Sequence, residues 1–105
     1  MKMMLEQCGF EVLQASDGES AVNLFEDNID RVKGILVDLV MPGISGIEVA
    51  AKIKKRKPHV KTVLVTGYLD KSLEMESADS VDVCLEKPFT VDNISEALLK
   101  AGLFE

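Results

Sequence analysis

Three polar residues stand at the ends of apolar, strand-like stretches of the sequence: Asp38, Thr66 and Lys87. A carboxylate can attack a phosphoryl group, an ammonium group can balance the phosphoryl charge, and a hydroxyl can donate to a phosphoryl oxygen. Such transfer also needs a divalent cation, usually Mg²⁺, held by oxygen ligands. Singly, each residue also fits a structural role, but together they favour phosphoryl chemistry centred on Asp38.

Asp38 belongs to the run GILVDLVMPGISG, which covers residues 34–46. Its apolar and β-branched content predicts a strand buried on both faces of a parallel sheet. A buried carboxylate costs free energy unless it is paired or bound to a metal, and ligands bind at the C-terminal strand ends of open α/β sheets. A turn-initiating role before Pro42 and Gly43 is the competing interpretation of Asp38.

Strand-like and helix-like segments alternate along the whole chain, which predicts an α/β protein with a parallel sheet, right-handed crossovers and helices on both faces. Two capping boxes predict helix starts, one led by Ser16 and one by Ser45. The first helix is expected to include Met1 and to end at Gly9. The segment 70–80 predicts only a short or mobile helix, and the last helix should start near Thr90. Strands are predicted at residues 10–15, 35–40, 62–66 and 81–86.

The length and composition fit one soluble domain spanning residues 1–105, with 47% hydrophobic and 29% charged residues. A formal net charge of −6 argues against direct nucleic-acid binding, and no stretch is apolar enough to cross a membrane. Cys8 and Cys84 lack metal-site spacing, so both are expected to be reduced. We therefore expect a cytoplasmic protein. Five basic residues within 52–57 are expected to complement a helix dipole, a contact surface being the less favoured interpretation.

The segments DLVMPGISG, VTGY and EKPFT, in this order, resemble the signatures of bacterial response-regulator receiver domains of the chemotaxis type, which have a flavodoxin-like fold. The resemblance implies that Asp38 accepts a phosphoryl group from a histidine kinase or phosphotransfer protein. It also implies that Thr66 is a switch hydroxyl, that Lys87 contacts the phosphoryl group, and that Asp38 and the Val40 carbonyl are Mg²⁺ ligands. The bond between Lys87 and Pro88 is expected to be cis.

One departure from this family concerns its first strand, which ends in an acidic pair and has no counterpart here. We expect Mg²⁺ binding to be weakened, and two strand edges to lose their neighbour in the family's 2-1-3-4-5 sheet. Either residues 10–15 pair directly with 35–40, or two chains share elements as a homodimer, or the chain is a truncated form of limited stability. In the first case Asp17 could approach Asp38 and partly replace the lost acids.

A second departure is Cys84, which stands where the family usually carries an aromatic switch residue. A small thiol cannot swing between buried and exposed positions as an aromatic ring does. Output through the face that the fourth helix and fifth strand form in this family is therefore in question. The signal would instead pass through Thr66 and the backbone alone, or Tyr68 could take part.

Three functions are compatible with these residues. The first is a phosphoacceptor receiver domain that switches conformation and acts on an output protein or effector domain. The second is a receiver-like interaction module that no longer takes phosphate. The third is a phosphohydrolase with an aspartyl-phosphate intermediate, but Val40 stands where that enzyme class carries a second Asp. We favour the first function and do not expect an enzyme.

Overall fold

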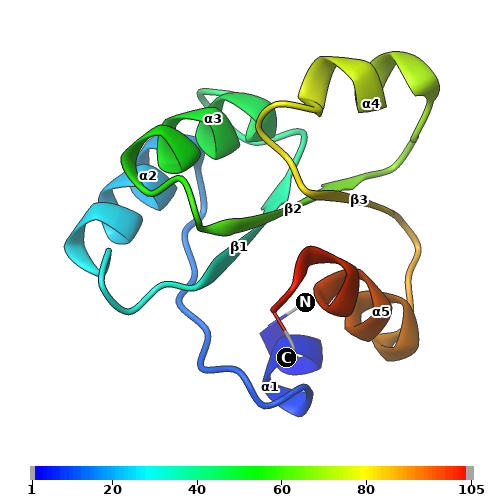
Figure 1. Cartoon of the computed structure of the whole chain (residues 1–105), viewed down its shortest axis with the longest axis horizontal. Coiled ribbons are helices and arrows are strands. Elements are labelled where there is room, and N and C mark those ends of the chain that lie inside the picture. Colours follow the sequence, from blue (N-terminus) through cyan, green and yellow to red (C-terminus); the bar gives the residue numbers. More distant parts are fainter. Residues whose placement is uncertain (1, 104–105) are drawn as a thin grey trace.

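The computed structural model describes residues 2–103, which form a parallel sheet of three strands with helices on both faces (Figure 1). The strands are β1 (Gly34–Asp38), β2 (Lys61–Thr66) and β3 (Val83–Glu86), in the order β1-β2-β3. Each pair is parallel, with Asp38 opposite Val65 and Thr66 opposite Glu86. The carboxyl ends of all three strands therefore lie at one edge of the sheet.

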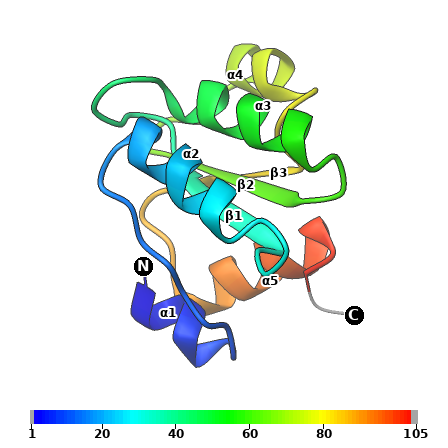
Figure 2. The ribbon, with the colours of Figure 1, turned by 90° about the vertical axis from the view of Figure 1, so that its left-hand side faces the viewer.

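The helices form two layers, one on each side of the sheet (Figure 2). On one side, α2 and α3 enclose a core that includes Phe25, Ile53 and Leu64. On the other side, α5 packs over Val63 and Val65, and α1 lies beside α5. The bounds are α1 (Lys2–Gln7), α2 (Gly18–Asp27), α3 (Gly46–Arg56), α4 (Lys71–Ser77) and α5 (Val91–Ala101). The predicted doubly wound α/β architecture is confirmed.

Strand β2 is the centre of the sheet, and residues Thr62–Thr66 are all buried. Leu64 faces α3, whereas Val63 and Val65 face α5, because successive side chains of a strand point to opposite faces. Both faces are covered by helices, which explains why this segment is apolar without interruption. Within residues 2–103, no helix has both the length and the hydropathy to cross a membrane.

The prediction of a strand at residues 10–15 is wrong. In the structure this segment pairs with no strand of the described chain, and the edge of β1 away from β2 has no neighbour there either. Phe10 packs on the α5 core, and its amide donates to the Leu5 carbonyl. The segment has the composition of a strand, but a strand also needs a neighbouring backbone to receive its hydrogen bonds. The proposed direct pairing with 35–40 is therefore not seen.

The helix starts agree with the sequence except at α2. Its N-cap is Asp17 and not Ser16, and the Asp17 carboxylate accepts from both the amide and the hydroxyl of Ser20. The backbone amide of Ser20 is the main reason why the pKa of Asp17 lies below its ordinary value. The Asp17 carboxylate is thus used in capping α2. Its suggested approach to Asp38 required residues 10–15 to pair with residues 35–40, and this pairing is not seen.

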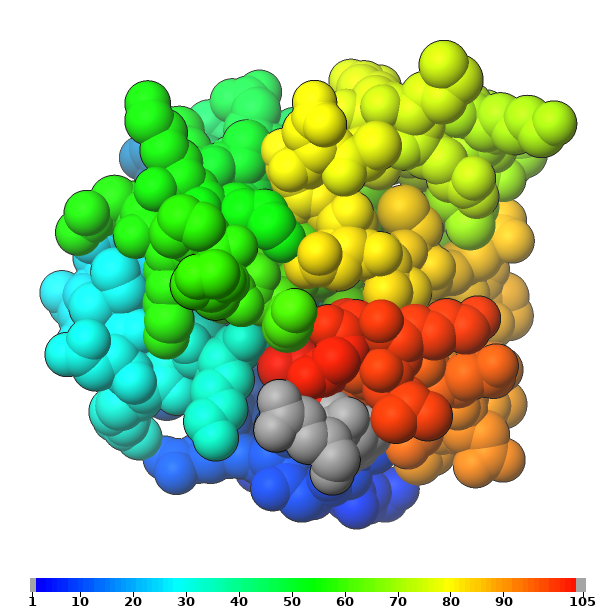
Figure 3. Space-filling view, in the orientation of Figure 1, coloured from blue at the N-terminus to red at the C-terminus, as the bar shows by residue number. Residues whose placement is uncertain are grey.

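The other caps follow the sequence. The Ser45 hydroxyl accepts from the Glu48 amide at the start of α3, and Thr90 caps α5. Gly9 has a φ of +92° after α1, as its predicted capping position requires. Met1, predicted in the same helix, lies outside the described residues. The predicted short helix in 70–80 is α4, which buries only Ser77 and projects from the body of the molecule (Figure 3).

A polar network ties α3, β2 and β3 together at the amino ends of the strands. Asp82 Oδ2 accepts from Lys54 Nζ at 2.7 Å, from the Thr62 amide at 2.8 Å and from the Thr62 hydroxyl at 3.1 Å. Partial burial acts to raise the pKa of Asp82, but these donors together outweigh it and lower the pKa below its ordinary value. The network therefore holds a carboxylate in its charged form.

The basic run at the end of α3 makes specific contacts beyond a general complement to the helix dipole. Arg56 binds the Glu26 carboxylate through two nitrogens, at 2.6 and 2.9 Å. Lys57 Nζ donates to the carbonyls of Ile29 and Val32 at 2.8 and 2.7 Å. These side chains fix the loop after α2 against α3, so part of the run has a structural role.

Candidate functional site

Asp38 and Lys87 form an ion pair at the carboxyl edge of the sheet. Asp38 ends β1, Lys87 directly follows β3, and Lys87 Nζ lies 2.8 Å from Asp38 Oδ2. The two side chains are 31% and 43% exposed, respectively. Because β2 lies between these strands, the lysine side chain reaches across its end. The Asp38 carboxylate is therefore paired with a cation and still open to solvent.

The backbone around Asp38 is fixed by close packing with the start of α3. The Leu39 amide donates to the Val65 carbonyl at 2.8 Å, and the Gly46 amide donates to the Leu39 carbonyl at 3.0 Å. A Cβ at Gly46 would collide with the carbonyl oxygen of Asp38. Only glycine allows this approach, so residue 46 helps to place the carboxylate.

Thr66 lies at the same edge, but in the described chain its hydroxyl makes no hydrogen bond to the paired side chains of Asp38 and Lys87. Its hydroxyl donates to the Tyr68 carbonyl and accepts from the Tyr68 amide, both at 3.2 Å. The register explains the separation: Asp38 is opposite Val65, so Thr66 points to the other face of the sheet. Of the three residues predicted from the sequence, the structure brings two into contact and places the third beside them.

Glu86 is a residue at this edge that the sequence reasoning did not select. Its Oε2 accepts from the Leu69 amide at 3.1 Å, in the loop between β2 and α4. The neighbouring Lys87 amide donates to the Thr66 carbonyl at 2.7 Å, which fixes the end of β3 to the end of β2. The available signal was the alternation of polar residues along β3, which marks Glu86 as a residue on its polar face.

The oxygen ligands available to a divalent cation are few in the described residues. The Asp38 carboxylate and the carbonyl of Val40, whose residue is 84% exposed, are the predicted donors. Residues 2–103 contain no group of three or more Asp, Glu, His or Cys side chains that could hold a metal ion. Mg²⁺ accepts one or two carboxylates together with waters, so this donor set alone makes a poor dedicated site.

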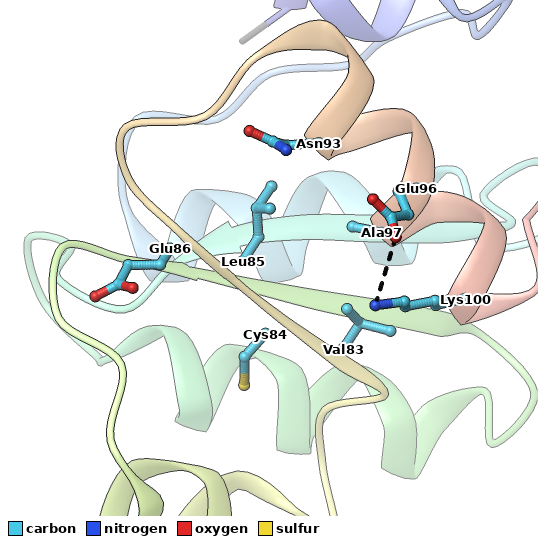
Figure 4. A pocket seen from close by; sticks show the side chains of 8 residues that line it. All are labelled: Val83, Cys84, Leu85, Glu86, Asn93, Glu96, Ala97 and Lys100. Carbon is cyan, nitrogen blue, oxygen red and sulfur yellow. Dashed lines mark ion pairs between the residues drawn. The ribbon is translucent and has the colours of Figure 1, made fainter.

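Cys84 and Leu85 point to opposite sides of β3 (Figure 4). Leu85 joins the core under α5, whereas Cys84 Sγ lies 3.8 Å from the Ser77 hydroxyl of α4. Both cysteines of the chain are free thiols, as predicted. A groove of about 280 Å³ runs between β3 and α5, and Glu86, Asn93, Glu96 and Lys100 are its polar lining residues (Figure 4). The bond between Lys87 and Pro88 is cis, as expected.

Comparisons with known proteins agree with this geometry. The model of the response regulator receiver domain matches residues 1–99. A cyclic di-GMP phosphodiesterase of Thermotoga maritima is 38% identical over 93 residues, which are 88% of this chain and 24% of that protein. The transcriptional regulatory protein YrkP of Bacillus subtilis is 35% identical over 92 residues, 86% of this chain and 38% of YrkP. The chain thus spans well under half the length of these curated relatives.

Solved structures give the same result for the fold. A response regulator receiver domain protein from Clostridium thermocellum superposes with a TM-score of 0.86 at 31% identity, over 95% of this chain and 80% of that chain. TrrA from Thermotoga maritima, solved in complex with Mg²⁺ and BeF, superposes with a TM-score of 0.82 at 33% identity, over 95% and 84% of the two chains. The expected flavodoxin-like fold is confirmed.

Proposed function

This chain belongs to the response regulator receiver domain family, and from that membership we propose that Asp38 is its phosphoacceptor in a two-component phosphorelay. The observation that carries the proposal is the ion pair of Asp38 with Lys87 at the carboxyl edge of the sheet. The ion pair holds the carboxylate in place, while the partial exposure of the carboxylate leaves room for a phosphoryl donor. The proposed domain comprises residues 1–105.

The proposed reaction is transfer of a phosphoryl group from a phosphohistidine to Asp38. An Asp38 carboxylate oxygen bonds to phosphorus as the phosphorus–nitrogen bond breaks, and the electron pair of that bond stays on the imidazole nitrogen, which takes up a proton. Water later attacks the phosphorus, which releases inorganic phosphate and restores the carboxylate. Lys87 balances the added charge throughout. The domain is regulatory and not an enzyme.

Conformational switching is the second part of the proposal. A phosphoryl group on Asp38 carries more negative charge than the carboxylate and offers more acceptor oxygens. Thr66 is the hydroxyl predicted to bind the phosphoryl group, but in this structure it is hydrogen-bonded to Tyr68. We propose that Thr66 exchanges Tyr68 for a phosphoryl oxygen, so that the loop after β2 moves and reports phosphorylation to the partner.

Mg²⁺ is the proposed cofactor, with Asp38 and the Val40 carbonyl as its protein ligands. Its chemistry there is to neutralise charge on the phosphoryl oxygens. Receiver domains generally bind Mg²⁺, and TrrA was solved with Mg²⁺ and BeF. We propose that binding is weakened here, in line with the small donor set among residues 2–103.

The proposed partners are a histidine kinase or phosphotransfer protein as donor, and an output protein or effector domain as recipient of the signal. Receiver domains act between such partners. We propose a cytoplasmic location and no direct contact with nucleic acid or membrane. A homodimer is a further proposal, because β1 has one edge without a neighbour in the described chain.

The small donor set also favours a second candidate function, a receiver-like module that acts by protein contacts without phosphorylation. Intact-protein mass after incubation with acetyl phosphate and Mg²⁺ separates the two candidates, with Asp38→Asn as the control. We expect a phosphoryl adduct on the wild type and none on the variant. A folded wild type without an adduct would instead support the interaction module.

A further inference from the structure

We propose that Glu86 is a positioning residue that holds the loop after β2 in its resting state, and that phosphorylation of Asp38 must release this contact. This proposal rests on the proposed function. It extends that function from the phosphorylated residue to the contact that holds the loop after β2 before phosphorylation. Glu86 contacts neither Asp38 nor Lys87 through any hydrogen bond of the described residues. Its effect would be exerted through the loop.

The contact itself is a charge-assisted hydrogen bond to backbone. Glu86 Oε2 accepts from the Leu69 amide at 3.1 Å. Leu69 follows Tyr68, whose own amide and carbonyl occupy the Thr66 hydroxyl. Thr66 therefore keeps its resting partner only while the segment of Tyr68 and Leu69 stays in place. Glu86 holds that segment from the side of β3.

The end of β3 connects this contact to the phosphoacceptor. Glu86 and Lys87 are consecutive in an extended segment, so their side chains leave the backbone in opposite directions. Lys87 binds Asp38, while Glu86 binds the loop. A shift of the Lys87 backbone toward a phosphoryl group would therefore move the Glu86 side chain relative to Leu69. The Lys87 amide on the Thr66 carbonyl ties this motion to the end of β2.

The negative charge of the phosphoryl group also favours release of the contact between Glu86 and Leu69. A phosphoryl group at Asp38 adds negative charge at the edge where Glu86 already holds one. The Thr66 hydroxyl then gains a charged acceptor in the phosphoryl group. Its binding to that acceptor competes with the resting position of the loop, in which Leu69 binds Glu86. The hydrogen bond from Leu69 to Glu86 is thus one of the resting contacts of the loop that phosphorylation opposes, and its removal should make the loop more open before any phosphorylation.

The test measures hydrogen exchange at the Leu69 amide by NMR, in wild type, Glu86→Ala and Glu86→Gln. We expect about threefold to tenfold faster exchange in Glu86→Ala, as loss of one such hydrogen bond predicts. Glu86→Gln retains an acceptor oxygen and should recover part of the protection. Tyr68 is the only tyrosine in a chain without tryptophan, so quenching of its fluorescence reports the same loop.

The matched control is Glu96→Ala, which removes the same charge from the same groove but from an ion pair with Lys100 on α5. It should leave Leu69 exchange unchanged. Equal exchange in Glu86→Ala and wild type, with both folded by circular dichroism, would overturn the inference. So would an equal acceleration by Glu96→Ala.

The second arm repeats the measurement with acetyl phosphate and Mg²⁺, with the adduct followed by intact mass. We expect an adduct on the wild type and faster Leu69 exchange, and little additional change in phosphorylated Glu86→Ala. An adduct without any change at Leu69 would overturn the coupling alone. No adduct would overturn the proposed function as well, while the first arm still decides whether Glu86 holds the loop.

Discussion

Gly46 packs directly on the backbone of Asp38, so that the start of α3 and the end of β1 approach more closely than any side chain would allow. We predict that Gly46→Ala lowers the free energy of unfolding by about 1–3 kcal/mol, the usual cost of forcing a methyl group into a packed site. The loss should occur although alanine is the better helix former. Urea unfolding measures it.

The matched control for this prediction is Gly67→Ala. A Cβ at Gly67 meets no atom within 4 Å, and the residue has no positive φ. We expect its free energy of unfolding to stay within about 0.5 kcal/mol of wild type or to rise slightly. Equal losses in the two variants would show that the close approach at Asp38 has no special cost.

Lys87→Ala should separate phosphorylation from switching. The variant keeps Asp38, so intact mass should still detect an adduct, although the carboxylate loses its cation at 2.8 Å. The conformational response should be lost, because Lys87 links the phosphoryl group to the ends of β2 and β3. Backbone amide spectra before and after phosphorylation measure this response.

Lys100→Ala serves as the control for Lys87→Ala. Lys100 is an exposed lysine of α5 whose ion pair is with Glu96 at 3.9 Å. It should show both the adduct and the full change in the spectra. A full response in Lys87→Ala would refute the role given to Lys87.

The polar network at Asp82 should give a stability that depends on acid pH. Its pKa is lowered in the folded state, so its contribution is complete above the unfolded pKa of about 4 and is lost as the pH falls through the folded value. Asp82→Asn should cost about 1 kcal/mol at pH 7, since one charge-assisted contact with Lys54 is lost. The difference from wild type should shrink below about pH 4.

Urea unfolding of both proteins at neutral pH and near pH 3 measures this dependence. Glu26→Gln is the useful comparison, because the Glu26 carboxylate accepts from the side chain of Arg56, whereas the Asp82 carboxylate accepts from both Lys54 and Thr62. Its effect at neutral pH should be the smaller of the two. A difference between Asp82→Asn and wild type that stays constant with pH would contradict the titration of Asp82.

Lys57→Met should destabilise the connection between α2 and α3. The ammonium group donates to two carbonyls of the loop after α2, and methionine keeps the apolar stem but removes both donors. We expect the free energy of unfolding to fall by about 1–2 kcal/mol. Lys55→Met, at an exposed position of the same run, should change it little. Equal effects would favour a general charge contribution over the specific contacts.

The sequence predicted most of the fold because patterns of burial repeat within each element. The run at β2 is apolar throughout and is buried on both faces, and the caps of α3 and α5 lie where Ser45 and Thr90 indicate. The prediction of a strand at residues 10–15 failed for the opposite reason. Their strand character depends on a pairing strand that composition does not reveal, and the sheet of the described chain consists of β1, β2 and β3.

The site was predictable as a set of positions but not as a set of contacts. Asp38 and Lys87 each follow an apolar run, which places both at one edge of a parallel sheet. The sequence does not state the register, and the register is what turns Thr66 away from Asp38. The contact of Glu86 with Leu69 depends on a loop conformation, which no periodic pattern encodes.

Strand β2 has Thr62 in the Asp82 network near its start and Thr66 at the proposed site at its end. These residues are four positions apart, a separation of about 13 Å along an extended chain. Substitutions at such a distance add almost independently. Lineages of this domain are therefore free to adjust heat tolerance at one end of a single strand and signal response at the other, without trading one against the other.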